Sequence, residues 1–252
     1  MMALLSLICL LIFIFVWFGP VLKRHKQIGG YIDKKTEAMA LFMGMIPTLA
    51  VIFLSQLGIG WIFHHTGMDK NRILLCFLQG FIMYGLIEEI TKYGFARLVL
   101  RKFEKLKKID IMVIFGFVGM GYEITESMLY GNLIAGIGRG LFVAHVMYQL
   151  IMAHFFYESI HAKNTGDDAG AKRNRILTLA IPVFVHGLND LFCELSSMYM
   201  DSYSNIGLSN ISFEQAIPII VYISGIIITN VACLVWGLRL SKKDPDIEVS
   251  LR

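Results

Sequence analysis

The chain has 252 residues, of which 56% are hydrophobic and 17% charged, and its formal net charge is +4. This composition excludes an ordinary soluble domain, because the apolar residues come in long runs separated by short basic clusters. A helix needs roughly 20 mostly apolar residues to cross a hydrocarbon core of about 30 Å. The sequence therefore predicts an all-α, polytopic membrane protein.

Seven runs are long and apolar enough to be predicted as transmembrane helices. In chain order they cover residues 3–18, 38–63, 73–96, 111–133, 141–160, 176–195 and 216–238. The first run has no basic segment before it and no small-residue cleavage pattern, so we expect a retained anchor rather than a cleaved signal peptide. We expect residues 1–243 to form one transmembrane domain and residues 244–252 to form a polar cytoplasmic tail.

Lysine and arginine residues alternate between the connections that join these runs. Of the 23 in the chain, 19 lie in four alternate connections, 3 lie in the other three, and Lys92 lies inside the third run. The four basic connections are residues 19–37, 97–110, 161–175 and 239–252. By the positive-inside rule the N-terminus is outside, the C-terminus is inside, and the expected location is the cell membrane. Topology thus accounts for the positive charge, and we expect no nucleic-acid partner.

Ionisable and polar side chains lie inside four consecutive predicted helices. A charge at the bilayer centre costs about 2.5–3.5 kcal/mol on insertion scales, so such residues normally face the protein interior. They are Glu88, Glu89 and Lys92 in the third run, Glu123 and Glu126 in the fourth, His145 and His154 in the fifth, and His186, Asn189 and Asp190 in the sixth. One alternative is that they only fix helix packing. Their number favours a functional site.

Helical spacing predicts which of these side chains can meet. Lys92 lies three and four residues after Glu89 and Glu88, so it can reach both carboxylates. We expect an ion pair that compensates one acid and leaves the other freer for chemistry. His145 and His154, nine positions apart, point about half a turn away from each other, so only one of them is expected to line the cavity. A depth count along the helices favours His154.

Carboxylates and imidazoles in a partly dry cavity suit two kinds of chemistry. In hydrolysis, a carboxylate takes a proton from a water that attacks a peptide carbonyl, while a donor such as Asn189 steadies the oxyanion. In proton or cation transport, the same groups act as relay stations. A third alternative is a non-catalytic scaffold that binds a partner. The sequence contains no HExxH, GxSxG, Walker A or Gly-rich dinucleotide motif.

Four motifs between about residues 80 and 192 resemble those of the PrsW family of intramembrane proteases, which belongs with the CAAX prenyl endopeptidases and Abi proteins. EEITK resembles the paired-glutamate motif at Glu88 and Glu89. GYEITESMLYG resembles the second motif, with its acid at Glu126, although Ser127 stands where the family usually has Asn. Arg139 with HVMYQLIMAHFF resembles the third motif, with a short gap before its His at His145. HGLND resembles the fourth, with His186 and Asp190.

This resemblance implies cleavage of a membrane-anchored protein, which in PrsW itself is an anti-sigma factor. It implies Glu88 or Glu89 as the general base, and His145 and His186 as partners of the water or the oxyanion. Lys92 is assigned to charge compensation. If a metal ion such as zinc takes part, the expected ligands are Glu89, His145 and His186.

Overall fold

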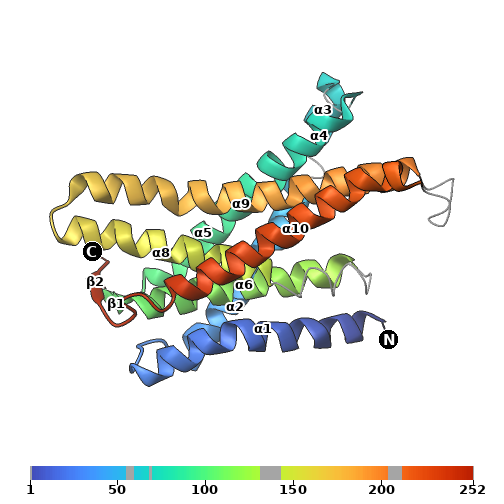
Figure 1. Cartoon of the computed structure of the whole chain (residues 1–252). Helices are drawn as coiled ribbons and strands as arrows, with labels where there is room; N and C mark the ends of the chain where they lie inside the picture. Colours follow the sequence, from blue (N-terminus) through green and yellow to red (C-terminus); the bar gives the residue numbers. More distant parts are fainter. Residues whose placement is uncertain (1, 55–59, 68–69, 131–142, 204–211, 252) are drawn as a thin grey trace.

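The computed structural model describes residues 2–54, 60–67, 70–130, 143–203 and 212–251 as a bundle of helices with a small sheet at one end (Figure 1). The long helices lie side by side along the bundle. The elements are α1 (Met2–Gln27), α2 (Lys34–Phe53), α3 (Gly60–Thr66), α4 (Arg72–Leu78), the π-helix η3 (Gln79–Leu86), α5 (Ile87–Leu100), β1 (Lys105–Lys107), α6 (Lys108–Tyr130), α8 (Ala144–Asn164), α9 (Asp168–Ser202), α10 (Phe213–Leu240) and β2 (Glu248–Ser250).

Among the residues that the structure describes, four helical segments are long and apolar enough to cross a membrane. They are Arg72–Leu100, Lys108–Leu129, Asp168–Ser202 and Phe213–Leu240. Large apolar side chains such as Phe15, Ile228 and Phe213 are mostly exposed on the outer helices, as expected of a surface that faces lipid. The protein is thus an all-α integral membrane protein, while seven spans and an outside N-terminus stay predictions.

The centre of the bundle is formed by α6 and α8. In the apolar window of α6, 67% of the residues are buried, against 17% in that of α10. Along α8, every residue from Val146 to Ala153 is buried, so this helix is covered by protein around its whole circumference. A polar side chain on either helix therefore meets protein rather than lipid.

The basic connections lie together at one end of the bundle, on the left of Figure 1, where the α1–α2 and α8–α9 turns and both strands are found. There β1 pairs antiparallel with β2, with Leu106 opposite Val249. Residues 244–251 of the segment that the sequence predicts as a polar tail are thus tied to the bundle by β2. The reason is that β1 offers it a backbone edge and a buried place for Val249.

A buried carboxylate joins the helices at this basic end. Asp110, fully buried at the start of α6, accepts hydrogen bonds from the backbone N–H groups of Tyr31 and Lys107 at 2.8 and 2.9 Å. Its third contact is with the His25 ring, at 3.0 Å. Because these partners come from α1, the α1–α2 turn and β1, Asp110 links three parts of the chain to the start of α6.

Glycines let α9 approach the η3–α5 segment closely. A Cβ atom on Gly85 would lie 2.9 Å from the carbonyl oxygen of Val183 and 3.1 Å from the Cα atom of Gly187. Real Cβ atoms essentially never come so close to backbone, so only glycine fits here. Gly85 lies three residues before Glu88, and Gly187 directly follows His186. The close packing of the two glycines therefore brings the side chains of Glu88 and His186 near each other.

We therefore predict that Gly85→Ala destabilises the protein by about 1–3 kcal/mol, because the methyl group overpacks a backbone contact. Gly94→Ala is the matched control, since it lies on the same helical segment and nothing stands within 4 Å of its Cβ position. That change is expected to stabilise α5 by about 0.5–1 kcal/mol. Unfolding of both variants in mixed micelles, followed by circular dichroism, measures the difference. Equal stabilities would contradict the packing argument.

Candidate active site

The first helix turn of α5 carries two buried carboxylates with different surroundings. Glu89 is fully buried and all its contacts are short: Oε1 lies 2.7 Å from Lys92 Nζ and 2.8 Å from His186 Nδ1. Its Oε2 accepts a hydrogen bond from Gln149 Nε2 at 2.8 Å. Both oxygens of Glu89 are therefore engaged, which suits a group that positions its neighbours.

Glu88 is the less constrained of the two acids. Its side chain is also buried, and Oε2 lies 3.4 Å from Lys92 Nζ and 3.7 Å from His186 Nε2. Within the described part of the chain, this oxygen has no hydrogen-bond partner. A buried carboxylate oxygen without a donor is costly, so such an atom points to a missing water or ion. We expected one acid to be compensated by Lys92 and the other to be freer. Glu89, at 2.7 Å from Lys92, is the compensated acid, and Glu88, at 3.4 Å, is the freer one.

His145 begins α8 inside the bundle and is held by groups from α5 and α6. Its Nδ1 atom lies 2.9 Å from Lys92 Nζ and its Nε2 atom lies 2.7 Å from Glu126 Oε2. Because an ammonium group only donates, Nδ1 is the acceptor and Nε2–H donates to Glu126. The backbone N–H of His145 donates to Glu123 at 3.0 Å. The two acids that share a face of α6 therefore both bind His145.

His186 on α9 is oriented by carboxylates on both sides of its ring. Nδ1 contacts Glu89, and Nε2 lies 3.2 Å from Asp190 Oδ2, one turn further along α9. Asn189 donates to Asp190 at 3.1 Å and in turn accepts a hydrogen bond from Asn230 of α10 at 2.6 Å. The position of the imidazole is thus set by residues of three helices.

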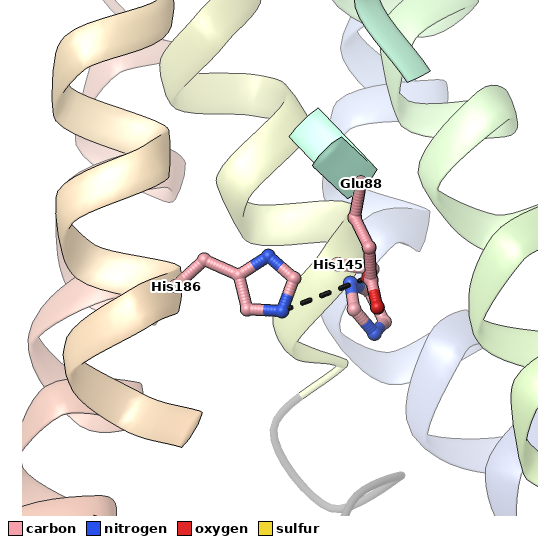
Figure 2. A group of neighbouring side chains, drawn as sticks. All are labelled: Glu88, His145 and His186. Atoms are coloured by element: carbon pink, nitrogen blue, oxygen red, sulfur yellow. Dashed lines mark ion pairs between the residues drawn. The ribbon is translucent and has the colours of Figure 1, made fainter. Parts of the chain in front are cut away.

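Glu88, His145 and His186 form the centre of the site (Figure 2). One ligand atom from each lies within 4.8 Å of the others, and all three residues are buried. Figure 2 shows Glu88 and His145 side by side, with the His186 ring pointing at them from α9. The group differs from the expected ligand set in one residue, since Glu88 rather than Glu89 lies in it.

His154, a residue of the third motif, lies away from this centre. His154 is 3.5 Å from Glu158 on its own helix, near Lys108 at the basic end of the bundle, and not beside Glu88. The depth count favours His154 because it takes residue 141 as a membrane surface. In the structure α8 runs from Ala144 to Asn164, and its first turn is enclosed by other helices. Arg139 lies outside the described residues.

Four further residues touch the site without having been predicted as part of it. Gln149 binds Glu89, Asn230 binds Asn189, the Tyr148 ring stacks on His186 at 4.9 Å, and Lys92 Nζ lies 4.0 Å above the Tyr122 ring. Two of them left a signal in the sequence. Gln149 stands one turn after His145, and Asn230 is an amide in the middle of an apolar run. The tyrosines left none, because aromatic residues are common in membrane helices.

Comparison with known proteins identifies the family of the chain. A family model described as PrsW family intramembrane metalloprotease matches residues 34–223, which include Glu88, His145 and His186 but not Asn230. Searches of curated proteins and of solved structures give no match. Since the family model covers most of the chain, this protein belongs to the PrsW family of intramembrane metalloproteases.

Proposed function

We propose that this protein is an endopeptidase that hydrolyses a peptide bond of a membrane-anchored protein at the Glu88, His145 and His186 centre. The observation that carries the proposal is the convergence of these three buried side chains from α5, α8 and α9 within 4.8 Å. A carboxylate and two imidazoles held around one small space can bind a water molecule and move its proton.

Each surrounding residue has a role in this reaction. Glu88, whose Oε2 has no hydrogen-bond partner, is the group nearest the water. Lys92 balances the charge of the two glutamates and holds His145 through its Nδ1 atom. Asp190 orients His186, and Asn189 is placed beside it to donate to an oxyanion. The side chains of Glu126 and Asp190 are 13% and 14% exposed, so the centre opens towards them.

The same three side chains would fit a zinc ion if one ring nitrogen of His145 exchanged its present contact, with Lys92 or Glu126, for the metal. Two imidazoles and one carboxylate are a common zinc ligand set in hydrolases, and Glu88 Oε2, which has no hydrogen-bond partner among the described residues, is the oxygen that such an ion would satisfy. The contact of His186 Nδ1 with Glu89 matches the way ligating histidines are oriented by carboxylates. A bound zinc ion supplies Lewis acidity and makes its water more acidic. Glu126, 2.7 Å from His145, is then the carboxylate left to accept the proton.

The substrate class follows from where the centre lies. A peptide bond reaches buried side chains of membrane helices when it belongs to a segment that enters the bilayer. An anti-sigma-factor-like protein, anchored in the cell membrane by one helix, is a substrate of this kind.

We predict that His145→Ala lowers the cleavage rate at least a hundredfold, because it removes a ligand or water partner. His154→Ala is the matched control, since His154 is also buried on α8 but lies beside Glu158. It should retain activity within a few-fold. The assay uses the full chain in nanodiscs with a membrane-tethered peptide, and metal analysis of both variants accompanies it.

The same preparation separates the alternatives. Proton flux across a vesicle without cleavage, abolished by His145→Ala, would favour a transporter. Substrate binding without cleavage under any metal condition would favour a non-catalytic scaffold. Loss of activity in His154→Ala and not in His145→Ala would overturn the assignment of the centre.

A further inference from the structure

A cavity lies at the basic end of the bundle, apart from the centre around Glu88. It has a volume of about 530 Å³, is partly open to the surface, and is lined by residues of α5, α8 and α9 together with Ser250 and Leu251 near the C-terminus. Arg97, in its wall, is nine residues beyond Glu88 on the α5 helix, which is roughly 13 Å at 1.5 Å per residue. The proposed hydrolysis uses none of the side chains that line this cavity.

The charge of the cavity is of one sign. Four basic side chains line it: Arg97, Arg101, Lys163 and Arg175. No aspartate or glutamate is among the described residues that line it. None of the four forms an ion pair with a carboxylate in the part of the chain that the structure describes. Four cations around one space repel one another, so an anion between them would lower the energy.

All four basic side chains are exposed, and specific contacts hold Arg97 and the C-terminal wall of the cavity in place. The Arg97 guanidinium lies 5.4 Å from the Phe156 ring and donates to the Tyr93 hydroxyl at 3.0 Å. Asn164 donates to the Ser250 carbonyl at 3.2 Å, and the Leu251 N–H donates to the Glu104 carbonyl at 2.8 Å. These bonds hold the C-terminal segment in place as one wall, so the space does not depend on a ligand to form.

We propose that this cavity binds a phosphate group. Arginine matches phosphate oxygens through paired N–H donors, and Ser159 and Asn164 add polar groups to the lining. The volume suits a headgroup or a small phosphate compound rather than a bare chloride ion. The basic end is the expected cytoplasmic side, where anionic lipid headgroups concentrate and basic pockets between helices receive them.

The test measures binding by the purified full chain, without any cleavage assay, so its outcome is independent of the proposed function. In one arm, native mass spectrometry and thermal unfolding follow titration with phosphatidylglycerol, against phosphatidylcholine as the neutral lipid. In the other arm, calorimetry follows inorganic pyrophosphate added to protein in phosphatidylcholine nanodiscs. The variant is Arg97→Gln with Arg175→Gln. The control is Lys172→Gln with Arg173→Gln, which removes two exposed charges of α9 that do not line the cavity.

We expect the first double variant to bind roughly 25-fold more weakly, at about fivefold for each removed charge near an anionic headgroup, and the control to bind as the wild type does. Binding of phosphatidylglycerol alone identifies a lipid headgroup as the ligand, and binding of pyrophosphate identifies a soluble phosphate compound. Binding of neither by the wild type overturns the proposal. Equal losses in the variant and the control overturn it as well, because they show general surface attraction.

Discussion

Replacing Glu88 with glutamine is expected to lower the cleavage rate by about 10²–10⁴-fold, the usual contribution of a carboxylate that moves a proton. The substitution keeps the shape of the side chain and removes its charge. Oε2 of Glu88 has no hydrogen-bond partner in the described part of the chain, so glutamine weakens its longer ion pairs with Lys92 and His186 but leaves the hydrogen bond between Lys92 and Glu89 in place. The protein should therefore fold and lose activity.

Glu37→Gln is the control for this change. Glu37 is also buried, but it lies in the first turn of α2 and pairs with Lys34. The Glu37→Gln variant should cleave the tethered peptide at a rate close to that of the wild type. Metal analysis distinguishes the two roles of Glu88: a lower zinc content in Glu88→Gln identifies it as a ligand, because an amide is a weaker ligand than a carboxylate, and an unchanged zinc content identifies it as the group that moves the proton. Undiminished cleavage by this variant would refute its place at the centre.

The second large effect is expected on stability. Lys92→Met removes the cation that lies 2.7 Å from Glu89 and 3.4 Å from Glu88, and all three side chains are buried. Breaking a buried ion pair by removing one partner typically costs 3–5 kcal/mol, because it leaves an uncompensated charge, and we expect a loss of about that size. Unfolding in mixed micelles measures it.

A double variant tests the cause of that loss. Adding Glu89→Gln to Lys92→Met removes the uncompensated charge while keeping the hydrogen bond to Gln149 within reach. Most of the lost stability should return. The double variant should stay inactive, because it lacks the ammonium group of Lys92 that contacts His145 and the carboxylate of Glu89 that contacts His186. If Lys92→Met alone unfolds as the wild type does, the ion pair contributes no stability. A double variant no more stable than Lys92→Met would point to lost packing instead.

The contacts within one helix could be predicted from the sequence. The spacing of Glu88, Glu89 and Lys92 predicts that the ammonium reaches both carboxylates, and the structure has both contacts. Likewise His186 meets Asp190 one turn along α9. These predictions hold because residues three and four apart always share a helix face, whatever the rest of the protein does.

Contacts between helices could not be predicted in the same way. Which histidine of α8 meets Glu88 depends on how far α8 is shifted along α5, and the depth count gave the wrong neighbour for His154. Which glutamate has both oxygens in hydrogen bonds depends on Gln149 and His186, which come from two other helices. The close packing at Gly85 and Gly187 sets this approach, and it involves residues far apart in sequence.

From sequence alone, apolar run length and the basic connections determined that this is an all-α membrane protein, and the four motifs determined its family resemblance. Only the tertiary structure decided that Glu88 Oε2 lacks a hydrogen-bond partner among the described residues and that His145 rather than His154 lies beside it. It also decided that four basic side chains line a cavity at the basic end of the bundle. The physical reason is that helix periodicity is a local property of the chain. Axial shift and crossing angle between helices result from packing among many distant side chains.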